Sequence, residues 1–159
     1  MNKRALIKKI VAKLADELET YFRAAQFSRA EATHESSKAE NKYDTRGLEA
    51  SYLARGQSKQ AAEIKSAIAE FEKLPAKQFG AGEPVDLGAL VELENGGERS
   101  FYFIGPRAGG TEVVHDKKEI LVITPQSPLG AQLADKKSGE NFQLILGGAK
   151  QSAKIVSVE

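Results

Sequence analysis

The fold is decided near the start of the chain by the stretch IKKIVAKLADELETYFRAA, residues 7–25. Apolar or slim side chains recur in it at alternating intervals of four and three. The residues of this seam are Ile7, Val11, Leu14, Leu18, Tyr21 and Ala25. Such spacing predicts a long helix that packs along one stripe of its surface, as in a coiled coil. We expect Leu6, Ile10 and Phe22 to widen the stripe.

A second seam of the same kind follows at Ala50, Ala54, Gln57, Ala61, Ile64, Ile68 and Phe71. When the two seams are folded antiparallel, facing residues have an almost constant sum of residue numbers. The sum is 78 for Ile7 with Phe71 and 79 for Leu18 with Ala61. This constancy predicts a turn near residue 39, between two helical arms of roughly 30 residues, or about 45 Å each.

The two arms have an alternative arrangement as part of a larger helical bundle. A bundle would need apolar residues on further helix faces, and polar side chains fill those faces here. The pattern therefore favours a free-standing antiparallel hairpin. A homodimer formed through the helices also stays open.

Proline and glycine divide the chain into two parts. All five prolines and twelve of the fourteen glycines lie after residue 74. This shift predicts a helical hairpin at 1–74 with its tip near 35–44, a linker at 75–84 and a second domain at 85–159.

The second domain contains short β-like runs that end at glycine or proline. The expected strands are 89–94, 100–104, 119–124, 142–146 and 153–158. Ser127 and Pro128 predict the start of a short helix that reaches Leu133, because serine caps helices and proline suits the first helical position. The fold class is therefore α+β, with a helical hairpin before a small antiparallel β domain.

Composition limits the kinds of partner. The chain has 23 basic and 22 acidic side chains, a net charge of +1, so no general attraction draws it to nucleic acid or membranes. It has no cysteine, which excludes disulfides and thiolate metal sites and fits a reducing cytoplasm. No stretch approaches the roughly 20 apolar residues of a membrane span. We expect a cytoplasmic protein without a membrane partner.

Two motifs carry a resemblance to a known family. The first is ILVITPQSPLGAQL at 120–133, followed by KKSGE at 136–140. The second is KAENKYD at 38–44, beside the predicted turn. Both resemble motifs of the GreA/GreB transcript cleavage factors, which have an antiparallel coiled coil before a small FKBP-like domain. The chain departs from the family at Ser37, where a tip aspartate is usual, and at Asp135, where a glycine is usual.

The resemblance implies a mechanism and a partner. Factors of this family insert the hairpin tip into the secondary channel of RNA polymerase, where tip carboxylates help to hold a second Mg²⁺ that cleaves backtracked RNA. It implies an accessory factor rather than an enzyme, with no stably bound cofactor of its own. We expect a monomer, with nascent RNA as a further contact through the basic residues near the start of the chain.

The resemblance also nominates residues. Glu40 and Asp44 are the candidate catalytic carboxylates and Mg²⁺ ligands, with Glu35 as a weaker third. The candidate polymerase contacts are Asn41, Tyr43, Arg46, Ser127 and Pro128. Carboxylates at a helix start also act as simple caps, so this structural role stays open for each of them.

Three other functions remain open at this stage. A Gre-like regulator or inhibitor would bind the channel without cleaving RNA, which the loss of the tip aspartate at Ser37 would fit. A prolyl isomerase or chaperone would use the β domain, but it would need the rings of Phe101, Tyr102, Phe103 and Phe142 to converge. A purely structural coiled-coil dimer is the third.

Overall fold

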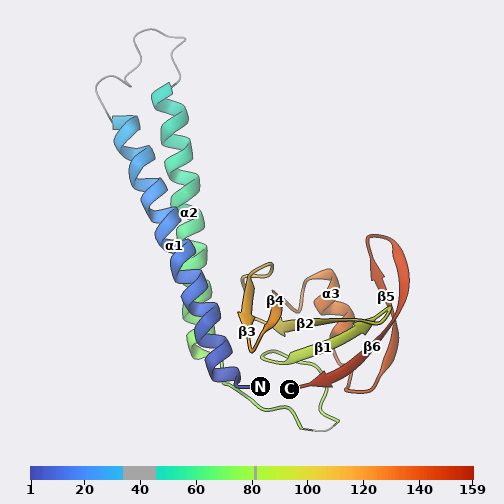
Figure 1. Cartoon of the computed structure of the whole chain (residues 1–159). Coiled ribbons are helices and arrows are strands. Elements are labelled where there is room, and N and C mark those ends of the chain that lie inside the picture. The colour runs from blue at the N-terminus through green and yellow to red at the C-terminus, as the bar shows by residue number, and fades with distance from the viewer. Residues whose placement is uncertain (34–45, 81) are drawn as a thin grey trace. The chain divides into compact units, whose positions relative to one another are not determined.

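The computed structural model describes residues 1–33, 46–80 and 82–159 (Figure 1). The elements in chain order are α1 (Lys3–Thr33), α2 (Arg46–Lys73), β1 (Leu90–Asn95), β2 (Glu98–Ile104), β3 (Glu112–His115), β4 (Lys118–Ile123), α3 (Pro128–Leu133), β5 (Asn141–Leu146) and β6 (Ala149–Val158). This confirms the predicted class, a helix pair followed by a sheet domain with one short helix.

The chain forms two compact units, and their boundaries differ from those predicted from the distribution of proline and glycine. One unit contains Met1–Lys13 and Ala69–Glu159, and the other contains Leu14–Ile68. The base of each long helix therefore packs with the sheet. The division at 1–74, 75–84 and 85–159 stays a prediction about the chain's domains.

Local signals set the helix ends. Asn2 caps α1, because its side-chain oxygen accepts a hydrogen bond from the Ala5 amide at 3.1 Å. After α2 ends, Pro75 blocks a further helical turn. Neither helix, in the ranges that the structure describes, has the length and apolar character needed to cross a membrane.

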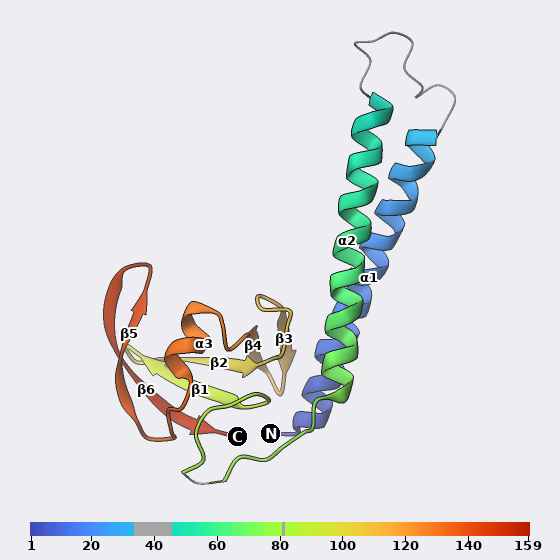
Figure 2. The ribbon, with the colours of Figure 1, turned by 180° about the vertical axis from the view of Figure 1, so that it is seen from behind.

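The unit Leu14–Ile68 is a pair of antiparallel helices that lie side by side (Figures 1 and 2). Leu14 and Ala25 of α1 are buried, as are Ala54 and Ala61 of α2. All four belong to the predicted seams, and Ser28 continues the first seam by one further step. The 4-3 pattern therefore identified buried positions in each helix, whereas Leu18, Tyr21 and Ile64 of the same seams are half-buried.

The sheet has six strands in the order β3-β4-β2-β1-β6-β5. Two glycine pairs form tight turns: Gly96-Gly97 joins β1 to β2, and Gly147-Gly148 joins β5 to β6. All four glycines have positive φ, between 56° and 86°, as two-residue hairpins of this type require.

The prediction of a wholly antiparallel sheet was wrong at one pair. β2 and β4 run parallel, with Phe103 beside Val122. The cause is β3, a strand that the sequence reading missed. Because β3 reverses the chain once more before β4 begins, β4 enters the sheet in the same direction as β2.

One face of the sheet packs against α3. Val91 and Leu93 of β1 and Ile155 of β6 are buried there with Leu133 of α3. These four side chains are each at most 2% exposed, so this cluster forms the main core of the C-terminal domain.

The opposite face holds Phe71, from the last turn of α2. Its ring stacks on Phe103 with centroids 6.4 Å apart. A Cβ at Gly105 would lie 2.7 Å from the Phe71 ring and 2.8 Å from Val122, so only glycine leaves room for this contact. Phe71 itself is fully buried.

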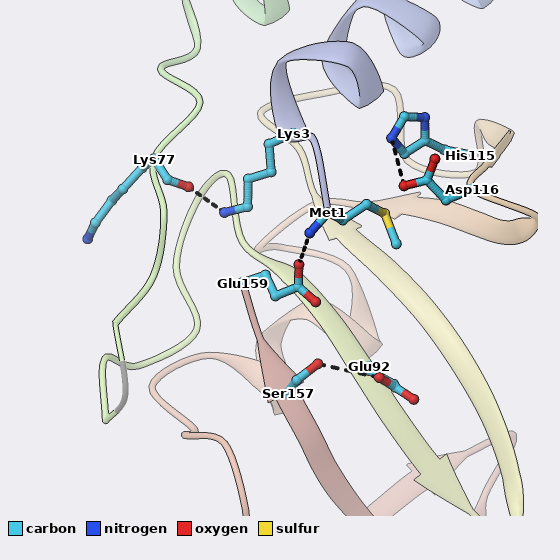
Figure 3. Close-up of polar contacts among 8 residues, drawn as sticks. All are labelled: Met1, Lys3, Lys77, Glu92, His115, Asp116, Ser157 and Glu159. Atoms are coloured by element: carbon cyan, nitrogen blue, oxygen red, sulfur yellow. Dashed lines mark hydrogen bonds and ion pairs between the residues drawn. The ribbon is translucent and has the colours of Figure 1, made fainter.

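Polar contacts fix the start of α1 in the same unit (Figure 3). The Met1 amino group pairs with the Glu159 carboxylate at 2.6 Å. The Lys3 ammonium donates to the Lys77 carbonyl and lies 4.3 Å from the centroid of the Phe79 ring. Burial lowers the pKa of Lys3 from its ordinary value of 10.5 to about 8, although the nearby Glu159 carboxylate opposes the change.

His115 is the second buried polar side chain of note, at 5% exposed. Neither ring nitrogen has a hydrogen-bond partner among the described residues. The Asp116 carboxylate lies 3.6 Å from Nε2, which is too far for a hydrogen bond (Figure 3). His115 is therefore a core histidine.

The pKa of Lys3 predicts a pH dependence of stability. Between about pH 8 and 10.5 the unfolded chain holds a proton on Lys3 that the folded chain has released, so the free energy of unfolding rises with pH. In Lys3→Met this contribution is absent. Denaturant unfolding should therefore show the wild-type stability, relative to Lys3→Met, increasing from pH 8 to pH 10.

The exposed Lys13→Met is the matched control and should leave the wild-type pH dependence intact. A stability difference between wild type and Lys3→Met that stays flat over this pH range would show that Lys3 keeps an ordinary pKa.

Candidate functional site

The predicted acidic tip falls between α1 and α2. Residues 34–45 lie outside the described part of the chain, and they include Glu35, Ser37, Glu40, Asn41, Tyr43 and Asp44. Arg46 is the first residue of α2. The proposed roles of these side chains as ligands and polymerase contacts therefore stay predictions.

The helices that flank this segment form a pair. Thr33 ends α1 and Arg46 begins α2, and both lie at the same end of the pair (Figures 1 and 2). Near that end the Arg29 guanidinium donates to the Ser58 hydroxyl at 2.8 Å, which ties α1 to α2. The two helices therefore run antiparallel, as the seams predicted.

The metal prediction depends on this segment. Within residues 1–33, 46–80 and 82–159, no three His, Asp or Glu side chains gather closely enough to hold a metal ion. Two carboxylates alone would hold Mg²⁺ weakly, because this ion requires several oxygen ligands in octahedral geometry. A complete site would need further ligands from a partner.

The helix pair also has exposed apolar side chains, one of which was expected to be buried. Phe22, expected in the buried stripe, is 57% exposed, and Phe27 is 72% exposed. Beside Phe22 a groove of about 600 Å³ runs between the helices, with the small residues Ala25 and Ala61 in its lining. A 4-3 pattern shows which residues share a face but not whether that face is covered.

The turn before α3 is built around Ser127. Its hydroxyl donates to the Thr124 carbonyl at 2.8 Å and accepts from the Gly130 amide at 3.0 Å, so it caps the helix as predicted. Pro128 occupies the first helical turn and is exposed. The Ser127 hydroxyl is thus engaged inside the fold, whereas Pro128 offers free surface.

Position 130 requires glycine because a side chain would not fit there, and not because of its backbone conformation. A Cβ at this position would lie 2.0 Å from the Thr124 carbonyl oxygen and 2.9 Å from the Ser127 hydroxyl. Because the carbonyl belongs to the backbone, it cannot move aside as a side chain would. The sequence Ser-Pro-Leu-Gly is therefore a structural unit in which the cap and the glycine require each other.

The basic turn after α3 is held by Glu140. Its carboxylate accepts from the Lys137 amide at 3.0 Å and from the Lys136 ammonium at 3.2 Å. These contacts lower the pKa of Glu140, with the backbone hydrogen bond as the main cause. Gly139, at φ 85°, supplies the left-handed residue that the turn needs.

Comparison with known proteins assigns this domain. Residues 81–159 match the family described as transcription elongation factor, GreA/GreB, C-terminal. Residues 81–159 therefore form a GreA/GreB C-terminal domain. The motif at 120–140, which carried the resemblance, lies inside the matched region.

Solved structures of Gre proteins also align with the chain. The GreA factor homolog 1 (Gfh1) of Thermus thermophilus is 24% identical, with 94% of each chain covered and a TM-score of 0.39. Thermus aquaticus Gfh1 is 23% identical, with 96% of this chain and 95% of that chain covered and a TM-score of 0.41. A GreA/GreB factor from Nitrosomonas europaea is 18% identical, covers 74% of this chain and 94% of its own, and has a TM-score of 0.36.

The assignment to the family rests on the match at 81–159, since these TM-scores are all below 0.5. Among curated protein sequences, none matches the chain significantly.

The structure explains one departure from the Gre pattern. Asp135, at the usual place of a glycine, has a φ of 63°, in the left-handed region. Aspartate tolerates this region better than most residues, because its short polar side chain can bond locally. The position therefore keeps the conformation that a glycine would adopt, without the glycine.

The rings of this Gre domain do not gather as an isomerase site would require. Phe103 stacks on Phe71 on one face of the sheet. Tyr102 and Phe142 pack against the cluster on the other face. Alternation along β2 separates neighbouring rings in this way.

The Gly130 contact predicts a large loss of stability on adding one methyl group. Gly130→Ala should lower the free energy of unfolding by about 2–3 kcal/mol, as overpacking against a fixed backbone does. Gly109→Ala is the matched control, because its Cβ would meet the Thr124 side chain at an ordinary 3.5 Å. Equal unfolding midpoints for the two variants in a denaturant titration would contradict the steric account.

Proposed function

We propose that this Gre-like chain is an accessory factor of RNA polymerase. In this proposal the end of the helix pair that carries residues 34–45 enters the secondary channel of the polymerase and acts on backtracked RNA. The match of residues 81–159 to the GreA/GreB family carries the proposal. The helix pair that precedes this domain supports it, because it presents both flanks of the segment at one end.

Glu40 and Asp44 are the proposed reactive side chains. With the polymerase's own bound metal nearby, they would complete the ligands of a second Mg²⁺, an ion that favours carboxylate oxygens and retains several waters. Two such ions stabilise the attacking and leaving oxygens of a phosphoryl displacement. The chain itself holds no cofactor stably in this scheme, and it acts as a monomer.

The remaining nominated residues fall into two proposed contact sets. Asn41, Tyr43 and Arg46 would meet the channel wall. On the Gre domain, exposed Pro128 would contact the rim of the channel, and Ser127 would support it through the cap described above. Nascent RNA would be a further contact of the complex.

A second candidate function is a channel-binding regulator that does not cleave RNA. It is favoured by Ser37, which replaces the aspartate usual at the tip and removes one carboxylate from the proposed ligand set. Such a factor would change the extension of a stalled transcript without shortening it.

The double substitution Glu40→Gln with Asp44→Asn tests the metal mechanism. It keeps side-chain size but removes both charges, so cleavage in a stalled, backtracked complex with Mg²⁺ should fall by at least about tenfold. The measurement is the fraction of RNA shortened over time. Binding to the polymerase should persist.

Asp16→Asn with Glu63→Gln is the matched control, since both carboxylates are exposed on the helix pair away from residues 34–45. If both double variants support equally fast cleavage, Glu40 and Asp44 are not the Mg²⁺ ligands. A wild-type protein that alters extension without shortening RNA supports the regulator instead, and one with neither effect defeats the proposed function.

A further inference from the structure

A groove of about 570 Å³ lies at the base of the two long helices, wholly within the unit that contains the sheet. Its walls are the first turns of α1, the last turn of α2 and the residues that follow it. It lies outside both the segment 34–45 and the Ser127 turn, so the proposed function gives it no role.

The α1 wall is one stripe of the helix. Arg4, Ile7, Lys8 and Val11 line the groove, and their spacing of three, four and seven places them on one face. Ile7 is buried and Val11 is half-buried, whereas Arg4 and Lys8 are exposed. This wall therefore combines an apolar floor with a cationic rim.

The rim cations have no partner within the described residues. Lys9 of the same helix is already bound, because its ammonium donates to the Val114 carbonyl at 2.9 Å. The side chains of Arg4 and Lys8 make no ion pair or hydrogen bond with any described residue, and the same holds for the exposed side chain of Lys73 on the α2 side. Against these three cations the described lining contains one carboxylate, that of Glu72.

This chemistry favours an acidic protein segment over nucleic acid. Single-stranded nucleic acid binds by stacking bases on exposed aromatic faces as well as by charge. The aromatic side chain in this lining, Phe71, is fully buried, and the accessible floor is aliphatic. Carboxylates would meet the rim, and an aliphatic side chain would meet the floor.

From this charge complementarity we infer that the groove docks an acidic segment of RNA polymerase that carries at least one aliphatic side chain. The inference rests on the proposed function. It adds an attachment that is independent of residues 34–45 and of Pro128. Rim charges of this kind mainly raise the association rate and make affinity depend on salt, whereas apolar floor contacts slow dissociation.

The test is the affinity of the labelled full-length chain for nucleic-acid-free core RNA polymerase, measured at low and moderate salt. Arg4→Glu with Lys8→Glu should weaken binding about tenfold at low salt and flatten its salt dependence. Lys150→Glu with Lys154→Glu, which reverses two exposed lysines on β6, should change affinity by less than about twofold. Val11→Thr should speed dissociation and leave the salt dependence unchanged.

Each outcome decides the inference. Wild-type binding that the groove variant does not weaken, or that the β6 control weakens equally, overturns it while the proposed function stands. In a second assay the same variants are cross-linked in a backtracked complex that contains RNA. If Arg4→Glu with Lys8→Glu loses cross-linking to RNA while its affinity for core polymerase is unchanged, the groove binds RNA and the inference is overturned. A wild-type chain that does not bind core polymerase defeats both proposals. Thermal unfolding of each variant confirms that the fold is retained.

Discussion

The contact of Phe71 with the sheet is the constraint on which the rest of the molecule depends. The last turn of α2 places this ring on Phe103, and Gly105 leaves the space for it. At the start of α1, Lys3 and Lys9 bond to the carbonyls of Lys77 and Val114. Both long helices are thus fixed at their bases by the domain that belongs to the GreA/GreB family, and their other ends flank residues 34–45.

The family motif in this domain has a structural explanation that is independent of any partner. Ser127 caps α3, and Gly130 leaves room for the Thr124 carbonyl. Glu140 closes the basic turn, and Asp135 adopts the left-handed conformation of a glycine. These residues are therefore required by the fold. Pro128 and the groove beside Arg4 are better candidates for binding, because they are exposed and no described residue covers them.

Sequence periodicity predicted the elements whose signals are local. The 4-3 seams gave both helices, and Gly96-Gly97 gave the hairpin between β1 and β2. It missed β3, which has four residues and turns through Asp116-Lys117 rather than through glycine. It also missed the exposure of Phe22 and the burial of Lys3, because both depend on contacts distant in sequence. The tip carboxylates were found by motif and remain predictions.

The central claim is that residue 40 reaches the active centre of RNA polymerase. The chain contains no cysteine, so Glu40→Cys allows a photo-crosslinker to be attached at one defined position. In a backtracked complex it should cross-link to protein or RNA at the active centre, while a crosslinker at Lys150→Cys on β6 should not. Cross-links from position 40 confined to the outer surface of the polymerase, with the factor still bound, would contradict the account.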